Sequence, residues 1–387
     1  MSGPDLFHRP RSIRRGAALT LVFASVLFTG AAAGSWSEQG RKNPQPPARS
    51  AAPADKVADA AAEAMADGKS PAEAAEAAEE AVSRSGDRWA SVYDATEYEE
   101  FAQELEGEYT GVGLWARRTR DGAIEVTRVQ RGGPAERAGI VRGDRLRTVD
   151  GKPVADRPVS EVLARLRGRG ADAGTRVELG LTRGTRAWSR VLRRETLETE
   201  SVSSRTLAGG PVLIKVTAFT KGTGEQVRSA VRSAPDHAGI LLDLRGNAGG
   251  LVSEAVVAAS AFLDGGLVAT YDEKGEQRAL HAEAGGDTLR PLVVLVDGGT
   301  MSAAELLTGA LQDRGRAVVV GTRTFGKGSV QMPTRLPDGS VAELTVGHYR
   351  TPSGRGVDGR GITPDLEAGE AAEERARTVL SGLGTPS

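Results

Sequence analysis

The sequence predicts a mixed α/β chain, in which a small β-rich domain precedes a larger layered core. From residue 211 onward, apolar β-branched runs alternate with helical stretches, a pattern typical of helices packed on a sheet. Between residues 108 and 196, short β-branched runs are separated by glycine-rich turns. An Ala/Glu-rich stretch, which begins at residue 55, predicts helices ahead of both.

The composition excludes several classes of function. The chain has 387 residues, enough for two or three domains, and its 50 basic residues balance 51 acidic ones. A protein that binds nucleic acid normally carries a surplus of basic residues, so this balance argues against a nucleic-acid partner. Cysteine is absent, which excludes disulfides, thiolate metal sites and a cysteine nucleophile. The four histidines lie far apart in sequence, so we expect no clustered metal site and no cofactor.

The first 36 residues have the pattern of an export signal. Four arginines between residues 9 and 15 precede an uncharged run of 19 residues, 16–34. The run exceeds a typical signal core of ~7–15 residues and approaches the ~20 that span a bilayer. Residues 1–36 are therefore predicted to be a cleaved signal peptide or a membrane anchor, and residues 37–54 a linker. Either fate places the rest of the chain outside the cytoplasm, secreted or membrane-anchored.

The segment 55–107 is predicted to be helical, with a break near Gly68. Ser70 and Pro71, with Glu73 three residues after the serine, have the pattern of a helix start. The scarcity of large apolar residues leaves two alternatives, a short helical pair or partial disorder. The tail 367–387 is predicted to be a terminal helix or disordered.

The β-rich domain, 108–196, contains a loop suited to a peptide C-terminus. Predicted strands cover residues 111–116, 124–129, 146–149 and 177–181, with a helix over 159–166. Gly111, Val112, Gly113 and Leu114 place glycine-flanked amides next to a strand, where they could bind a carboxylate while the peptide extends the sheet. The alternative is a structural β-domain that binds nothing.

The larger core, 197–366, has four buried-type strands with helices between them. The strands are predicted over 212–216, 239–244, 292–296 and 317–320, and the helices over 223–234, 252–263 and 303–313. Ser302 stands where the third strand turns into the third helix. The unpaired N–H groups of that first helical turn suit an oxyanion, which makes Ser302 a candidate nucleophile. The alternative is an ordinary helix N-cap.

Lys327 is the candidate base for such a serine. The chain uses 42 arginines and only 8 lysines, and Lys327 lies between two glycines after an apolar strand. A serine nucleophile needs a base. Arginine does not deprotonate in proteins, whereas a desolvated lysine can. Gln331, four residues later, could orient the amine. The alternatives are a solvated turn lysine or a phosphate contact.

A glycine-rich loop, residues 245–250, follows the second core strand. Glycines there let the backbone approach a ligand, and the N–H groups at the following helix start could complete an oxyanion hole. A plain glycine-rich turn is the alternative. Asp243 and Arg245 could form a supporting ion pair.

Together these segments resemble the C-terminal processing proteases, also called tail-specific proteases, which are Ser/Lys peptidases with an internal PDZ domain. The resemblance covers roughly residues 87–366. Its motifs are RGGPAERAGI–VRGDRL–VDG (131–151), DLRGNAGG (243–250), Ser302 with Ala303 and Glu305, GALQDRGRAVVVG (309–321), TFGKGSVQ (324–331) and YRTPSGRGVDGRGITPD (349–365).

The resemblance implies a crotonase/Clp-protease-like peptidase core with an inserted PDZ domain. It implies that Ser302 is the nucleophile, Lys327 the general base and Gln331 the residue that orients the lysine. It also implies an oxyanion hole from the amides of Gly249 or Gly250 and of Ala303. The PDZ loop Gly111, Val112, Gly113, Leu114 would bind the substrate carboxylate. The expected partners are proteins or peptides with free C-termini, the membrane if the N-terminal segment is retained, and a second copy of the chain through the helical segment.

Two departures from the family pattern lie near the predicted reaction centre. Thr300 and Met301 stand where Ser-Ala is usual, and Ala248 stands where Pro is common. Two other functions compete with a peptidase: a non-catalytic adaptor that binds protein tails, and a crotonase-like acyl-CoA enzyme. The presence of both Ser302 and Lys327 argues against the adaptor, and the PDZ segment argues against the acyl-CoA enzyme.

Overall fold

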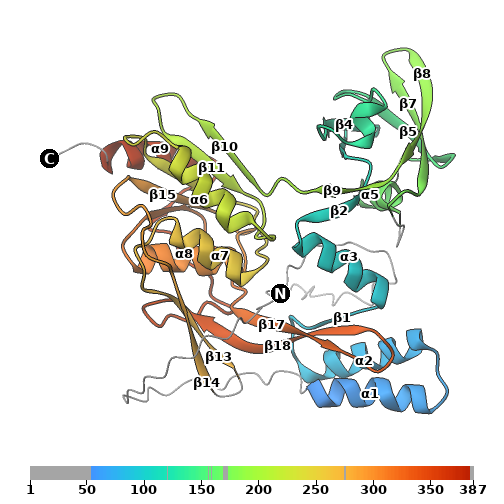
Figure 1. Cartoon of the computed structure of the whole chain (residues 1–387), viewed down its shortest axis with the longest axis horizontal. Helices are drawn as coiled ribbons and strands as arrows, with labels where there is room; N and C mark the ends of the chain where they lie inside the picture. The colour runs from blue at the N-terminus through green and yellow to red at the C-terminus, as the bar shows by residue number, and fades with distance from the viewer. Residues whose placement is uncertain are drawn as a thin grey trace, which may run out of the picture. The chain divides into compact units, whose positions relative to one another are not determined.

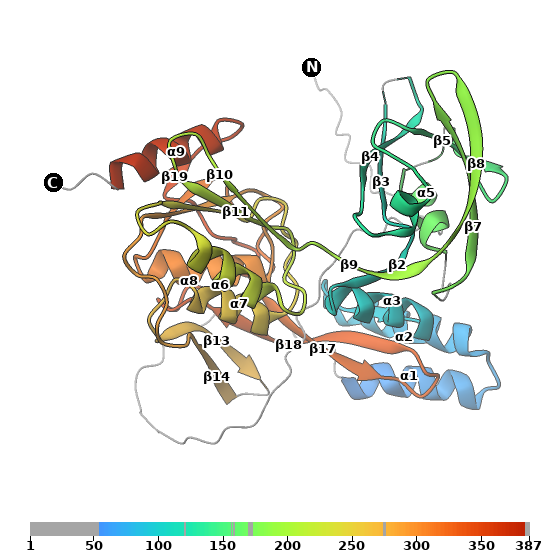
Figure 2. The same cartoon turned by 45° about the horizontal axis from the view of Figure 1, so that its top comes forward.

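The computed structural model describes residues 54–383 except 120, 156, 158, 169–172 and 274–275 (Figures 1 and 2). The predicted signal or anchor and the linker up to residue 53 lie outside the described residues. Within the described part, no helix is long and apolar enough to cross a bilayer. The described chain divides into two compact units: a smaller one, Tyr109–Leu197, and a larger one made of residues 54–108 and 198–383.

The larger unit is built on a six-stranded sheet in the order β10-β11-β12-β15-β16-β19. All neighbours are parallel except the pair β10 and β11. Its strands are β10 (Val202–Thr206), β11 (Val212–Val216), β12 (Ile240–Asp243), β15 (Leu292–Val296), β16 (Val318–Gly321) and β19 (Leu366–Glu367). Parallel strands covered on both faces are expected to be apolar throughout, as β15 is.

Helices cover both faces of this sheet because its strand residues alternate between them. Ile214, Leu242 and Val294 share one core cluster with α6 (Thr223–Ser233), α7 (Val252–Ser260) and α8 (Ala303–Asp313). Leu213 and Leu241 belong to a second cluster, which includes α9 (Ala372–Leu383). The tail that the sequence left open is thus helical up to Leu383. The predicted helix 252–263 ends earlier, at Ser260.

A second sheet in the same unit joins the core to the N-terminal helices. Its order is β1-β18-β13-β14, with β17 also paired to β18. Its strands are β1 (Ser91–Tyr93), β13 (Leu267–Glu273), β14 (Glu276–His281), β17 (Ser329–Arg335) and β18 (Val341–Arg350). Ala342 and Leu344 of β18 pack with Val57 of α1 (Ala54–Ala66) and Val82 of α2 (Pro71–Ser85). Figures 1 and 2 show the β17–β18 hairpin running along these two helices.

The N-terminal segment is a helical pair followed by a third helix, α3 (Ala95–Leu105). The predicted helix start at Ser70 is confirmed: Glu73 Oε2 accepts the Ser70 N–H at 2.9 Å, and Pro71 is the first helical residue. Of the two alternatives for this stretch, the structure therefore shows the helical pair.

The smaller unit contains a five-stranded path, β3-β4-β5-β7-β8, with β6 paired to β5. Its elements are β3 (Leu114–Arg118), β4 (Ile124–Val129), α4 (Pro134–Arg137), β5 (Arg145–Val149), β6 (Lys152–Pro153), α5 (Val159–Arg167), β7 (Arg176–Arg183) and β8 (Arg186–Arg193). Two further strands, β2 (Glu108–Gly111) and β9 (Glu195–Glu198), pair with each other. The predicted single strand 111–116 is wrong, because Gly113 adopts φ 74° and separates β2 from β3.

Candidate active site

Ser302 lies at the junction of β15 and α8, as predicted, in an unusual backbone conformation. Its φ is 55° and its ψ is −119°, and the residue is fully buried. A positive φ is uncommon for a residue with a Cβ, and such residues are often found at functional sites. An ordinary N-cap serine has extended backbone angles. Ser302 is the N-cap residue of α8, but its backbone conformation is not that of an ordinary N-cap serine.

One buried carboxylate joins the Ser302 turn to the loop that carries Lys327. Glu305 Oε2 accepts the backbone N–H groups of Ser302 and of Lys327, each at 2.9 Å. Its Oε1 accepts the N–H of Gly326 at 2.7 Å and the hydroxyl of Thr324 at 2.5 Å. Burial raises the pKa of Glu305, whereas these hydrogen bonds favour its charged form. The backbone nitrogens of Ser302 and Lys327 are thus held a few ångströms apart.

No role for Glu305 was predicted from the sequence. Its position three residues after Ser302 is the position of the acidic partner in a capping box, and this was the available signal. The carbonyl group of Ser302 is fixed as well, because the buried Tyr349 hydroxyl donates to it at 3.0 Å. Burial raises the pKa of Tyr349 far above its usual value, so this hydroxyl stays protonated.

Lys327 is buried, as a lysine base requires. Burial lowers the pKa of its amine to about 8, and the carboxylates of Glu343 and Asp87 oppose the shift. The Nζ atom lies 5.4 Å from the ring centroid of Trp89. Trp89 in turn packs against Phe325, with ring centroids 5.7 Å apart. The solvated-lysine alternative therefore does not describe Lys327.

Gln331 lies on β17, opposite Thr345 of β18, and is buried. Its carboxamide nitrogen donates to the backbone carbonyl of Trp89, in the segment between α2 and β1. Its carboxamide oxygen has no hydrogen-bond partner among the described residues. The carboxamide is thus oriented by Trp89, and its oxygen is the atom that can accept a hydrogen bond from an amine.

The glycine-rich loop 245–250 is held by contacts of its own and by one hydrogen bond to Met301, the residue before Ser302. The predicted Asp243–Arg245 pair is confirmed, with Arg245 Nη2 2.7 Å from Asp243 Oδ2. Asn247 accepts the Met301 N–H on its backbone oxygen at 2.9 Å. Its side-chain Oδ1 accepts the Gly249 N–H at 2.8 Å.

Gly249 lies directly against the candidate nucleophile. A Cβ at this position would be 2.9 Å from the Cβ of Ser302 and 3.2 Å from the nitrogen of Ala303, and φ is 101°. Only glycine fits such a contact. Since the Gly249 N–H already donates to Asn247, Gly250 and Ala303 are the predicted oxyanion donors for which the described part of the chain offers no such acceptor. Ala303 is the first residue of α8, so its N–H has no acceptor within the helix.

The predicted carboxylate loop belongs to the smaller unit. Gly111 ends β2, Leu114 begins the edge strand β3, and Val112 and Gly113 form the turn between them. The carbonyls of Val112 and Gly113 accept the N–H groups of Ala135 and Gln130, at 3.0 and 2.9 Å.

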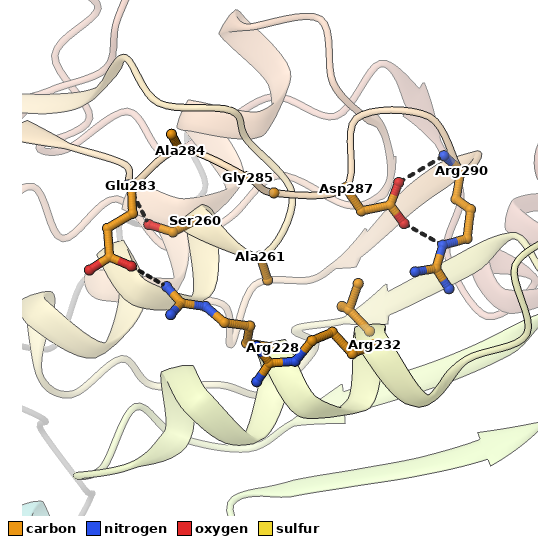
Figure 3. A pocket seen from close by; sticks show the side chains of 11 residues that line it. Arg228, Arg232, Ser260, Ala261, Glu283, Ala284, Gly285, Asp287 and Arg290 are labelled. Atoms are coloured by element: carbon orange, nitrogen blue, oxygen red, sulfur yellow. Dashed lines mark hydrogen bonds and ion pairs between the residues drawn. The ribbon is translucent and has the colours of Figure 1, made fainter.

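A separate cavity of about 360 Å³ lies between α6, α7 and the loop 283–290 (Figure 3). Arg228 and Arg290 line it, and they form ion pairs with Glu283 and Asp287. Neither Ser302 nor Lys327 borders this cavity. Among the described residues, no group of three or more acidic or histidine side chains could hold a metal ion.

Comparison with known families identifies both units. Residues 212–368 match the model of peptidase family S41, and residues 125–183 match that of a PDZ domain. Residues 212–368 form a peptidase domain of family S41. The expected resemblance to the C-terminal processing proteases is confirmed, and the names of the relatives agree with the predicted enzyme class, a serine-type peptidase. The fold class, a peptidase core with a PDZ domain and N-terminal helices, is confirmed as well.

Two curated relatives and one solved structure illustrate the similarity. The carboxy-terminal processing protease CtpA of Bacillus subtilis is 32% identical over 287 residues, 73% of this chain and 61% of that protein. The chloroplastic carboxyl-terminal-processing peptidase 3 of Arabidopsis thaliana is 36% identical over 306 residues, 74% of this chain and 58% of that protein. The photosystem II D1 C-terminal processing protease has a TM-score of 0.50 at 28% identity, over 81% of this chain and 86% of that one.

The chain spans 61% and 58% of the length of these two curated relatives. Part of each relative is therefore unmatched by this chain.

Proposed function

We propose that this chain is a serine endopeptidase in which Ser302 is the nucleophile and Lys327 the general base. The observation that carries the proposal is the Glu305 carboxylate, which holds the backbone of both residues at 2.9 Å. A base must lie within reach of the proton it removes, and its pKa should be near the working pH. The buried Lys327 amine, with a pKa of about 8, meets the second requirement.

The reaction follows from these roles. The neutral Lys327 amine takes the proton of the Ser302 hydroxyl as the serine oxygen attacks the peptide carbonyl. The resulting ammonium gives that proton to the leaving amine, and a covalent acyl-enzyme remains. A water molecule, deprotonated by the same amine, then attacks the ester and releases the second product.

We assign the oxyanion hole to the backbone amides of Gly250 and Ala303, with Gly249 as the residue that allows close approach to Ser302. The carboxamide oxygen of Gln331 is suited to accept a hydrogen bond from the Lys327 amine, since its nitrogen is already bound to Trp89. Donors placed beside a developing oxyanion contribute about 3–4 kcal/mol of transition-state stabilisation each.

For the PDZ domain we propose recognition of free protein C-termini. Strand β3 is an edge of its sheet, so a peptide can add to it as a further strand. The loop Gly111, Val112, Gly113, Leu114 precedes this edge, and two of its carbonyls are already paired with the domain. Its amides can then bind the terminal carboxylate. Both curated relatives are named for carboxy-terminal processing, which agrees with this substrate class.

We further propose that the enzyme acts outside the cytoplasm. This rests on the basic N-terminus followed by the uncharged run 16–34. Membrane attachment through that run and dimerisation through the N-terminal helices stay predictions.

The test is cleavage of an unfolded protein such as casein by the full chain, beside Ser302→Ala and Lys327→Arg. We expect both variants to lose activity by at least about a thousandfold, although the arginine keeps the charge. Retained activity in either variant would remove that residue from the mechanism. Binding of C-terminal peptides by an unmodified chain that cleaves nothing would support the adaptor instead. A fluorescent peptide with its C-terminus amidated tests the loop, since equal affinity for both forms would exclude carboxylate binding.

A further inference from the structure

Glu343 is a buried carboxyl group for which the proposed reaction gives no role. It is the third residue of β18, is only 1% exposed, and neither of its oxygens has a hydrogen-bond partner among the described residues. Buried carboxylates normally accept several hydrogen bonds, because desolvation of the charge is otherwise expensive. An unsatisfied carboxyl at this depth therefore needs an explanation.

The strand register places Glu343 on the same face of the sheet as Gln331. Gln331 lies opposite Thr345, and Glu343 precedes Thr345 by two residues, so their side chains point to one side. The alternate residues, Ala342 and Leu344, point to the other side and pack on α1 and α2. The polar face of the β17–β18 hairpin thus carries both Glu343 and the residue proposed to orient Lys327.

The charged and titratable groups around Glu343 come from four parts of the chain. Burial raises the pKa of Glu343 to about 7, and the ammonium of Lys327, in the loop before β17, opposes that shift. Burial raises the pKa values of Tyr93 of β1 and Tyr98 of α3, and the Glu343 carboxylate adds to both shifts. Arg335, at the end of β17, acts on Tyr98.

Asp87 is the other carboxylate that acts on Lys327, but its environment differs from that of Glu343. Asp87 accepts hydrogen bonds from the backbone and hydroxyl of Thr345 and from the N–H groups of Trp89 and Ala90. It is therefore satisfied as a structural group. Glu343 has no comparable set of hydrogen-bond donors. Among the described residues, Lys327 is its main electrostatic partner.

We propose that Glu343 is a positioning residue for the general base, which stabilises the Lys327 ammonium that forms when the amine takes the Ser302 proton. This rests on the proposed function, in which Lys327 is that base. No proton passes to Glu343 in the step: the hydroxyl proton moves from Ser302 to the Lys327 nitrogen and then to the leaving amine. Near pH 8, where the Lys327 amine titrates, the Glu343 carboxyl is above its own pKa of about 7 and ionised, and it offsets the charge on nitrogen as a buried acid does beside a catalytic histidine.

Removal of the Glu343 charge is expected to change the pH profile of kcat/KM in two ways. The negative charge of Glu343 raises the pKa of Lys327, so its removal lowers that pKa and makes the amine neutral at lower pH. The rise of kcat/KM with pH then shifts to lower pH. The amine also becomes a weaker base, so the plateau at high pH falls. A merely structural residue would lower activity without moving the pH at which it rises.

The experiment compares the full chain with Glu343→Gln, which keeps the size of the side chain and removes its charge. We expect the midpoint of the rise in kcat/KM to fall by about 1 pH unit or more, with a plateau reduced about tenfold. Glu99→Gln is the matched control, because Glu99 is exposed on α3, and we expect its profile to equal that of the unmodified chain.

A direct titration separates this proposal from the proposed function. NMR of chain labelled on lysine side chains, in a Ser302→Ala background, follows the Lys327 amine among only 8 lysines, with Lys327→Arg to assign its signal. A titration of Lys327 that Glu343→Gln leaves unchanged, or moves to higher pH, overturns the role of Glu343. Retained cleavage by Lys327→Arg overturns the proposed base instead.

Thermal melting of each variant shows whether it is folded. If Glu343→Gln does not fold, Glu343→Asp is the second variant. Its shorter side chain keeps a carboxylate on β18 but moves the charge away from Lys327. It is then expected to shift the Lys327 titration downward by a smaller amount, and an unchanged titration in a folded Glu343→Asp would contradict the proposal.

Discussion

The Glu305 carboxylate accepts the backbone N–H of Lys327 at 2.9 Å across 22 positions of sequence. The same oxygen accepts the N–H of Ser302, which makes Glu305 the connection between the two proposed catalytic residues. The glutamate binds backbone groups on both sides, so it fixes the main chain and leaves both side chains to the chemistry.

Replacement of Glu305 by Gln is expected to damage both stability and activity. An amide has one acceptor oxygen, and its NH2 group would face donors that the carboxylate now satisfies. Unsatisfied buried donors cost about 1–3 kcal/mol each, so we expect a loss of about 2–4 kcal/mol in the free energy of unfolding. Urea denaturation measures it, with the exposed Glu374→Gln as control. Equal stability of Glu305→Gln and the unmodified chain would contradict this assignment.

Gly249→Ala is expected to displace Ser302. The added methyl group would lie 2.9 Å from the Ser302 Cβ, closer than carbon atoms normally approach. A displacement of about 1 Å at a reacting group can lower the rate about a hundredfold, and kcat on a fluorogenic peptide measures this.

Gly246→Ala is the matched control for that substitution. Gly246 belongs to the same loop and has φ 67°, but a Cβ there would meet nothing within 4 Å. Both alanines strain the backbone, so a similar loss of kcat in the two variants would show that strain, and not contact with Ser302, is responsible.

The pH dependence of cleavage is expected to follow the Lys327 amine. Only the neutral amine can act as a base, and its pKa is lowered to about 8. Below that pH, kcat/KM should therefore fall about tenfold per unit, and above it the activity should level off. Rates between about pH 6 and pH 9.5 test this. Constant activity from pH 6 to pH 8 would be incompatible with a lysine of this pKa as the base.

The core strands could be predicted because they are buried on both faces. Strands such as Leu292–Val296 are apolar at every position, and such runs can be recognised as strands without knowledge of the tertiary structure. Strand β17 begins with Ser329 and contains Gln331, and β18 contains Glu343, all of them buried. Because these buried positions are polar, the two strands lack the apolar pattern by which a buried strand is recognised, and the hairpin was not predicted.

The same reasoning applies to the site. Ser302 and Lys327 could be predicted from chemistry, since a strand-to-helix serine and a rare lysine between glycines are local signals. Trp89 and Gln331 are 242 positions apart, and their hydrogen bond depends on how the N-terminal segment packs on β17. No spacing in the sequence indicates such a contact. Residues that act through tertiary packing without a local signal, here Trp89 and Glu343, were therefore found only in the structure.

Trp89 provides a test of how burial lowers the Lys327 pKa. Its ring lies 5.4 Å from the Lys327 Nζ, and burial is the largest cause of the shift. Trp89→Ala removes the ring but keeps the backbone carbonyl that binds Gln331. Water then reaches the amine and its pKa rises toward the usual value, which outweighs the weak attraction of the cation to the ring.

The rise of kcat/KM with pH is therefore expected to move to higher pH in Trp89→Ala, by about 1 unit. This direction is opposite to that expected for Glu343→Gln, so the two variants check each other. Trp89→Phe, which keeps an aromatic ring at the same position, should move the profile less than Trp89→Ala does. A shift to lower pH in Trp89→Ala would mean that the ring stabilises the ammonium more than it excludes water.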